Sequence, residues 1–288
     1  MKKDAFSQLH PAVEFLFFLL AIGFGVAIRH PLYILAGCVC GGGYLLFLRG
    51  RQAVRFLAGG MAVFILLSAI NPLFSVYGET VLFTVFGRPY TWQALRYGMA
   101  VSGIFVVMLF WFACYSQVLT GDKFTALFGS VIPGLSLLLV MVLRMIPNLI
   151  RKAKQISAAR RCIGGGNEQA ARKAQLAEGM ARLSALTDWA LEGSITTADS
   201  MRARGYGTAK RTGFRRWQMT PTDWTVLVLI LVLAASVLAA GGWQAVYEPQ
   251  LLIQRPTWGL AAYWALLSLP SLLHIKEALL WRIFISRI

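Results

Sequence analysis

The chain has 288 residues, of which 57% are hydrophobic and only 14% are charged. Soluble domains normally carry about a quarter charged residues, and several runs here approach the roughly 20 apolar residues that cross a bilayer. The composition therefore excludes an ordinary soluble domain and predicts an all-α polytopic membrane protein. Its 28 lysines and arginines against 12 aspartates and glutamates are typical of cytoplasmic loops beside a lipid bilayer, and no nucleic-acid partner is expected.

Residues 1–120 are expected to form an N-terminal membrane block of four spans. The predicted spans are Ala12–Ile28, Pro31–Leu48, Phe56–Val76 and Tyr97–Val118. The start of the chain has the basic flank of a signal peptide, but Pro11 and Glu14 interrupt the beginning of its apolar run. We therefore interpret it as an uncleaved first span.

Turn and breaker residues organise the connections of this block. The run Arg49–Arg55 predicts a basic loop after the second span, and Gly78–Thr91 predicts a mixed loop before the fourth. Glycines in the second span allow close contact between helices. Asn71-Pro72 interrupts the third span near its end, where a kink with a locally satisfied backbone is favoured over a substrate site.

Residues 121–216 are expected to form a cytoplasmic or interfacial coupling-helix region between spans four and five. Its first part, Phe124–Ile150, is apolar but interrupted by Pro133-Gly134, Arg144 and Pro147. Four spans return the chain to the side of its N-terminus, and the basic insert that follows belongs on that same side. Phe124–Ile150 therefore predicts a re-entrant or interfacial hairpin, in which Arg144 either extends toward the lipid surface or has a structural role.

The insert Arg151–Arg216 contains 14 lysines and arginines and 5 acidic residues. Gly164-Gly165-Gly166 divides it into two helical stretches, the second running from about Glu168 to Arg204. Large apolar residues line one face of the second stretch at helical spacing, with small residues beside them. The large residues are Leu176, Met180 and Leu183, and the small ones are Ala177, Ala181 and Ala185. Small residues in this pattern favour a closely packed helix pair.

Residues 217–288 are expected to form a C-terminal membrane block of two spans, Trp224–Gly242 and Trp258–Leu273. Pro270 kinks the last span, and His274–Ile288 either continues it or lies along the interface. About six spans in total place both termini and the basic insert in the cytoplasm. Of the 28 lysines and arginines, 24 then lie inside or near the cytoplasm, in agreement with the positive-inside rule.

The insert ends in the string Arg202-Ala203-Arg204-Gly205-Tyr206-Gly207. Arg202 and Arg204 fall in the last turn of the predicted helix, where the helix dipole favours cations. Gly205 stands where a left-handed cap ends a helix. Two guanidinium groups at the tip of a rigid helix suit an acidic groove on a partner, because guanidinium binds a carboxylate through two hydrogen bonds. The alternative is an anchor on anionic lipid, worth about 1 kcal/mol per charge.

Four motifs, in this order, resemble the transmembrane T component of energy-coupling factor (ECF) transporters, a class of ABC importer. They are Leu9-His10-Pro11, Asn71-Pro72-Leu73-Phe74, Arg144-Met145-Ile146-Pro147 and Arg202-Ala203-Arg204-Gly205. The first departs from the family's Leu-Asp-Pro at His10. The third resembles the element that opens the family's first long coupling helix, and the fourth resembles its second arginine motif. The resemblance covers about residues 9–216.

This resemblance implies a non-catalytic subunit in the plasma membrane of a prokaryote. Its partners would be two cytosolic ABC ATPases and a separate substrate-binding membrane S component for a vitamin or a metal ion. ATP binding would move the coupling helices, and these would reorient the S component. The segment Arg202–Gly205 would contact one ATPase. The family's first arginine motif is expected near Ala159–Gly164, where the arginines stand two or three residues early, so the first contact is assigned to Arg160 or Arg161.

Two other classes of function stay open as alternatives, a secondary carrier and a membrane enzyme acting on lipid or isoprenoid. The sequence contains no Gly-x4-Gly-Lys-[Ser/Thr] phosphate loop, so we expect no ATP hydrolysis by this chain alone, and no cofactor. A carrier usually needs a carboxylate at mid-membrane, and the predicted spans carry acidic residues only near their ends. His10, His30 and His274 show no metal-ligand spacing. Cys38-x-Cys40 has the residues for a soft-metal site, but small buried hydrophobes are favoured.

Overall fold

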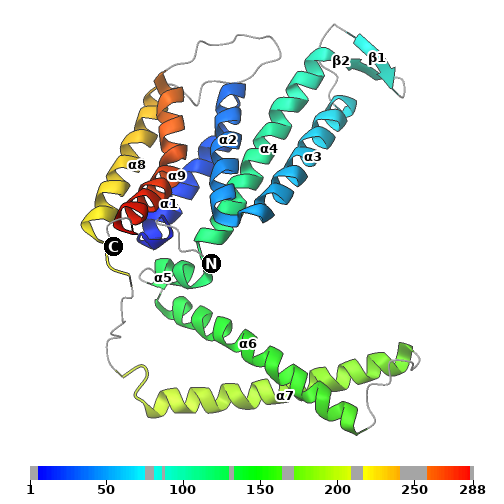
Figure 1. The fold of residues 1–288 in the computed structure, drawn as a ribbon. Coiled ribbons are helices and arrows are strands. Elements are labelled where there is room, and N and C mark those ends of the chain that lie inside the picture. Colours follow the sequence, from blue (N-terminus) through cyan, green and yellow to red (C-terminus); the bar gives the residue numbers. More distant parts are fainter. Residues whose placement is uncertain are drawn as a thin grey trace. The chain divides into compact units, whose positions relative to one another are not determined.

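A computed structural model describes residues 6–74, 81–85, 88–129, 133–163, 172–208, 217–240 and 258–285. The chain divides into two compact units, one of Met1–Phe124 with Trp217–Ile288 and one of Thr125–Arg216. Figure 1 shows the elements along the chain. They are η1 (Phe6–Gln8), α1 (Pro11–Ala27), α2 (Pro31–Arg49), α3 (Arg51–Phe74), β1 (Val81–Val85), β2 (Arg88–Thr91), α4 (Trp92–Val118), α5 (Gly121–Gly129), α6 (Pro133–Cys162), α7 (Arg172–Ala203), α8 (Pro221–Ala239) and α9 (Trp258–Ile285).

Among the residues that the structure describes, five helices of the first unit are long and apolar enough to cross a membrane. They are α2, α3, α4, α8 and the part of α9 from Trp258 to Glu277. α1 is also apolar but has 17 residues, which makes it about 25 Å long at 1.5 Å per residue, against about 30 Å for the hydrocarbon core. The chain is thus an α-helical membrane protein. Beyond the predicted last span, α9 continues as one helix to Ile285.

The predicted basic loop after the second span is wrong, because a single residue makes that connection. α2 ends at Arg49 and α3 begins at Arg51, so Arg55 also lies within a helix. Gly50 between them has a φ of 55°, a conformation that glycine adopts without steric cost. Its N–H donates to Leu46 O at 2.9 Å, which closes the end of α2.

The predicted mixed loop before the fourth span contains an antiparallel β-hairpin, which makes the fold predominantly rather than purely helical. β1 pairs with β2, with Val85 opposite Arg88. β-branched and aromatic residues in both segments favour strands, although an isolated two-stranded hairpin is only marginally stable. The Tyr90 hydroxyl donates to Ala69 O of α3 at 3.4 Å and so ties the hairpin to that helix.

Glycines bring α2 and α4 into close contact, as the sequence predicts. A Cβ on Gly37 would lie 2.9 Å from Cγ1 of Val107, and one on Gly41 would lie 3.0 Å from Nε1 of Trp111. The indole N–H of the fully buried Trp111 donates to Gly37 O at 3.2 Å. A side chain at Gly41 would meet the indole nitrogen, so this contact depends on glycine there.

Aromatic rings fill the core where η1 and α1 meet α2 and α4. Phe6 lies edge-on to Phe17 with ring centroids 5.1 Å apart, and Phe17 lies edge-on to Trp111 at 5.7 Å. Edge-to-face pairs are favoured over face-to-face stacks because of the ring quadrupole. α8 and α9 extend the same core through the buried residues Ile230 and Tyr263. The N-terminal and C-terminal membrane blocks therefore share one core.

The helices α1 and α2 each begin at a His-Pro pair. Nδ1 of His10 accepts from the Ala12 N–H at 3.2 Å, and Nδ1 of His30 accepts from the Leu32 N–H at 3.3 Å. Burial lowers the pKa of His30, which favours the neutral ring that accepts this bond. The proline supplies the φ that a first helical residue needs. His10 thus caps its helix as an aspartate would in a Leu-Asp-Pro motif.

Replacing His10 by alanine is expected to destabilise the protein by about 0.5–2 kcal/mol, the usual cost of losing an N-cap side chain. Thermal unfolding in detergent measures this loss. The matched variant His10→Asn keeps a cap acceptor and should unfold near the wild-type temperature. Equal stability of the alanine and asparagine variants would contradict a capping role for this imidazole.

The second unit consists mainly of two long helices, α6 and α7, which pack against each other. The prediction that a coupling helix opens at Arg144–Pro147 is wrong, because α6 begins at Pro133 and contains Pro147 in its interior. Proline inside a helix removes one hydrogen bond, but the Leu- and Met-rich sequence before it has high helix propensity. The expected hairpin segment Phe124–Ile150 corresponds to most of α5 and the first half of α6, and residues 130–132 lie outside the described part.

The predicted division of the insert into two helices is confirmed. α6 ends at Cys162, and α7 begins at Arg172, near the expected start at Glu168. The three glycines between them lie outside the described residues. Ala181 and Ala185 are half-buried, whereas Leu176, Met180 and Leu183 are 56–70% exposed. Ala177, the third of the predicted small residues, is exposed. The prediction of a buried small-residue side thus holds for Ala181 and Ala185, and the large apolar residues form an exposed stripe.

Candidate functional site

The C-terminal end of α7 has the hydrogen bonds of a Schellman motif. The Tyr206 N–H donates to Met201 O at 3.0 Å, and the Gly205 N–H donates to Arg202 O at 2.9 Å. These are the two bonds that define the motif. Gly205 has a φ of 75°, in the left-handed region that favours glycine. The predicted stop of the helix at Gly205 is confirmed.

This cap presents the two arginines at the helix tip. Arg202 lies in the last turn and Arg204 is the capping residue, and both are exposed, as is Ala203 between them. The negative end of the helix dipole favours cations at this place. A guanidinium fork at a fixed helix end binds a carboxylate with defined geometry. The tip is thus suited to an acidic surface.

Arg160 has a different environment from the two tip arginines. Its Nε lies 2.7 Å from Oε1 of Glu178, and its Nη2 lies 3.0 Å from Oε2, so guanidinium and carboxylate form a two-bond fork between α6 and α7. Arg182 donates to the same carboxylate at 3.1 Å. The hydrogen bond from Arg160 is the main cause that lowers the pKa of Glu178, and the fork therefore persists at neutral pH. Arg161 is exposed in the last turn of α6.

A cation–π contact is a second link between α6 and α7. The Lys152 ammonium lies 5.5 Å from the centroid of the Trp189 ring, within the range of a cation–π interaction. Together with the Arg160–Glu178 fork, it connects the two helices at separate positions. The two helices are therefore linked by an ion pair and a cation–π contact.

The remaining predicted site residues lie apart from this tip. Arg144 and Pro147 are both exposed on α6. Asn71 and Pro72 belong to the last turns of α3, which continues to Phe74, so the predicted break lies inside the helix. The side chain of Asn71 packs on α4, because a Cβ on Gly98 would lie 3.0 Å from Cβ of Asn71. Its Oδ1 is buried and has no hydrogen-bond partner among the described residues.

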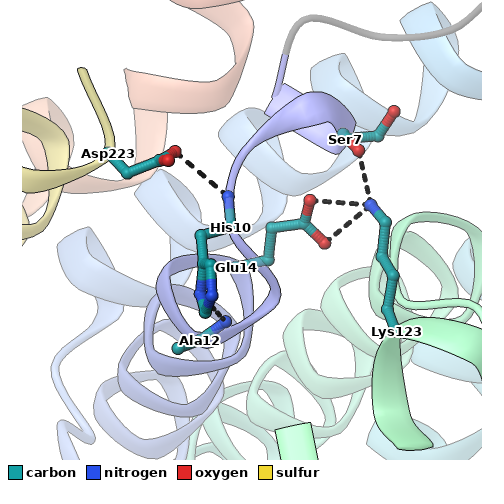
Figure 2. Close-up of polar contacts among 6 residues, drawn as sticks. All are labelled: Ser7, His10, Ala12, Glu14, Lys123 and Asp223. Carbon is teal, nitrogen blue, oxygen red and sulfur yellow. Dashed lines mark hydrogen bonds and ion pairs between the residues drawn. The ribbon is translucent and has the colours of Figure 1, made fainter. Parts of the chain in front are cut away.

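A buried ion pair in the first unit was not foreseen from the sequence (Figure 2). The Lys123 ammonium lies 2.7 Å and 2.9 Å from the two carboxylate oxygens of Glu14 and also donates to Ser7 O. The Glu14 side chain is fully buried, and that of Lys123 is 7% exposed. The one signal in the sequence was an acidic residue within an apolar run, which normally needs a cationic partner.

Lys123 of this ion pair lies close in sequence to the boundary between the two units. Lys123 lies two residues before the second unit begins, and its ammonium also lies 5.6 Å from the centroid of the Trp217 ring. Trp217 is the first residue after the second unit ends. One side chain thus joins α1 to the two places where the chain leaves and re-enters the first unit.

A second buried carboxylate lies at the start of α8. Asp223 accepts from the Thr220 N–H at 2.8 Å and from the His10 N–H at 3.0 Å, as Figure 2 shows for His10. The Thr220 hydroxyl oxygen in turn accepts from the Asp223 N–H at 3.3 Å, which completes a capping box. The start of α8 is therefore bonded to the start of α1.

No group of three or more potential metal ligands occurs among the residues that the structure describes. Cys40 and Cys114 are buried, Cys38 is half-buried and Cys162 is exposed, and all four are free thiols.

No family model and no curated protein matches the chain. The features of the chain that bear on its function are therefore the sequence motifs, the exposed tip of α7 and the buried polar contacts.

Proposed function

We propose that this chain is the energy-coupling transmembrane subunit of an ECF-type ABC importer for a vitamin or a metal ion. Two cytosolic ATPases and a substrate-binding S component would complete the transporter. The observation that carries the proposal is the end of α7, a 32-residue helix whose glycine cap presents Arg202 and Arg204 to solvent. An anchor on lipid needs only charge, whereas a fixed helix tip with two forks suits a specific acidic groove.

The α6–α7 pair has properties that a coupling element needs. A helix transmits displacement along its axis with little bending, and α7 is about 48 Å long at 1.5 Å per residue. The Arg160–Glu178 fork and the Lys152–Trp189 contact connect it to α6. In the proposed mechanism, closure of the ATPase dimer on ATP displaces the arginine tip, and α6 follows α7.

The exposed apolar stripe of α7 is the surface proposed to hold the S component. It consists of Leu176, Met180, Leu183, Leu191 and Ile195, each 56–70% exposed. Ala181 and Ala185 are half-buried and therefore less accessible to a partner than these exposed side chains. Large apolar side chains on an exposed helix face are typical of interaction surfaces.

Six spans, with α1 as the first, are proposed to place both termini and the second unit in the cytoplasm. A membrane-impermeant maleimide, applied to intact cells, should not label a cysteine at Gly207 in a Cys162→Ser background. The same reagent should label the control Thr84→Cys, because Thr84 of β1 is exposed. Labelling of the Gly207 variant without permeabilisation would contradict the proposed orientation.

Co-purification tests the assignment of function most directly. The tagged protein, expressed from its native chromosomal context, is expected to bring down two ATP-binding subunits and a small membrane protein. Liposomes that contain only this chain should show neither ATP hydrolysis nor substrate uptake. Uptake driven by an ion gradient in such liposomes would replace the proposal with a secondary carrier.

A further inference from the structure

An apolar groove of about 770 Å³ opens on the first unit between α2 and α3, with α4 as its floor. Figure 1 shows α4 between the other two helices, and α4 contacts both of them. The walls carry Leu35 and Cys38 from α2 and Met61 and Phe64 from α3. The volume lies within the usual range for sites that bind small molecules, about 300–1,000 Å³.

Close helix contacts create the shape of this groove. A Cβ on Gly103 would lie 2.7 Å from Cγ2 of Ile34, and one on Gly60 would lie 2.6 Å from Cε1 of Phe110. α4 therefore approaches α2 at one glycine and α3 at the other. Gly50 connects α2 to α3, and the two helices also meet where Gly42 faces Leu57. The groove lies between their side chains above α4.

One charged residue lines the groove. Arg96 of α4 is half-buried, and its guanidinium lies 5.7 Å from the Trp92 ring centroid. Among the described residues no carboxylate is paired with Arg96. Trp92 is 44% exposed near the start of α4, and tryptophan at the end of a spanning helix is typical of the level of lipid headgroups. A cation at headgroup level beside an apolar groove is complementary to an amphiphile with a negative head.

We propose that this groove binds one anionic phospholipid, with an acyl chain along α4 and the headgroup phosphate on Arg96. The chemistry favours lipid over a transmembrane helix of another protein. Helix interfaces in membranes are enriched in small residues, whereas Leu35, Met61 and Met99 expose 38–59% of their large side chains here. Flexible methionines adapt to a chain of variable conformation. This site is independent of the coupling role proposed for α7.

Photo-crosslinking tests the site in the purified full-length protein in lipid nanodiscs. The probes are phosphatidylglycerol and phosphatidylcholine, each with a diazirine on one acyl chain, and peptide mass spectrometry locates the adducts. Adducts are expected on α2, α3 and α4 residues of the groove. Phosphatidylglycerol should be preferred about fivefold, the effect expected of one arginine near anionic lipid.

Two variants separate the head and tail contributions. Arg96→Gln should abolish the headgroup preference while acyl adducts persist, and the matched variant Arg55→Gln on α3 should keep the preference. Met99→Trp should fill the groove and reduce its adducts severalfold, whereas Val228→Trp on the exposed side of α8 should not. Size-exclusion profiles confirm that each variant is folded.

Three results would overturn the proposal. Adducts spread evenly over exposed residues of α8 would indicate ordinary surrounding lipid. A headgroup preference that survives Arg96→Gln would remove the phosphate site. Loss of groove adducts only when another membrane subunit is added would assign the groove to a partner helix.

Discussion

Replacing Arg204 by glutamate is expected to release an ATPase from the proposed complex while the chain still inserts into the membrane. Glutamate would place like charges together in an acidic groove and leave a desolvated carboxylate unpaired. Removing one partner of a buried ion pair typically costs about 3–5 kcal/mol, which corresponds to a loss of affinity of roughly a hundredfold or more. Quantitative co-purification of the ATPases and substrate uptake in cells measure this effect.

Comparison of charge variants makes this test specific. Arg204→Lys should be intermediate, because lysine keeps the charge but loses the planar fork. Arg172→Glu, an equal charge change on an exposed residue at the other end of α7, should retain the ATPases. Replacements at Arg160 are expected to be milder than at Arg204, since its fork binds Glu178 within the same unit. If Arg204→Glu kept full assembly and uptake, the tip would be a lipid anchor.

Replacing Lys123 by methionine is expected to destabilise the first unit by about 3–5 kcal/mol, because it leaves the fully buried Glu14 carboxylate without its cation. Methionine fills a volume similar to that of the lysine stem, so the missing charge dominates the effect. Thermal unfolding of the detergent-purified protein measures the loss. The variant should also weaken the link between α1 and Trp217.

A double variant distinguishes ionic pairing from packing. Glu14→Gln combined with Lys123→Met removes both charges, and its stability should lie much closer to wild type than that of Lys123→Met alone. Glu14→Gln alone leaves the Lys123 ammonium with Ser7 O but without a carboxylate, and it should also destabilise. If Lys123→Met unfolded at the wild-type temperature, the ion pair would contribute nothing to the fold. If Lys123→Met lost more ATPase binding than its loss of stability explains, the ion pair would also support coupling.

Local sequence rules predicted the features that depend on neighbouring residues. Apolar runs determined which segments are helices long enough for a membrane, because each helix satisfies its backbone hydrogen bonds within itself. The end of α7 was predictable for the same reason, since the cap needs only Gly205 and the preceding turn. The helix boundary at the three glycines also follows from local propensity.

Predictions from local sequence were wrong where one helix follows another directly, where a proline lies inside a helix and where two strands pair. The expected basic loop is a single residue, Gly50, between two helices. Pro147 lies inside α6 and does not begin it, because the residues on both sides of it are helical. The hairpin forms because β1 and β2 pair with each other, and each segment taken alone was predicted as loop. The position of such elements depends on contacts that a single window of sequence does not contain.

Only the tertiary structure identified the polar contacts that connect distant parts of the chain. Glu14 and Lys123 are 109 residues apart, and His10 and Asp223 are 213 apart. An acidic residue near the start of an apolar helix indicates that it needs a partner, but not which of 28 basic residues supplies the charge. Likewise, the sequence resemblance assigned a partner contact to Arg160 or Arg161, and only the fold shows that Glu178 lies 2.7 Å from Arg160. Sequence determines which groups need partners, and the packing of helices decides which partners they find.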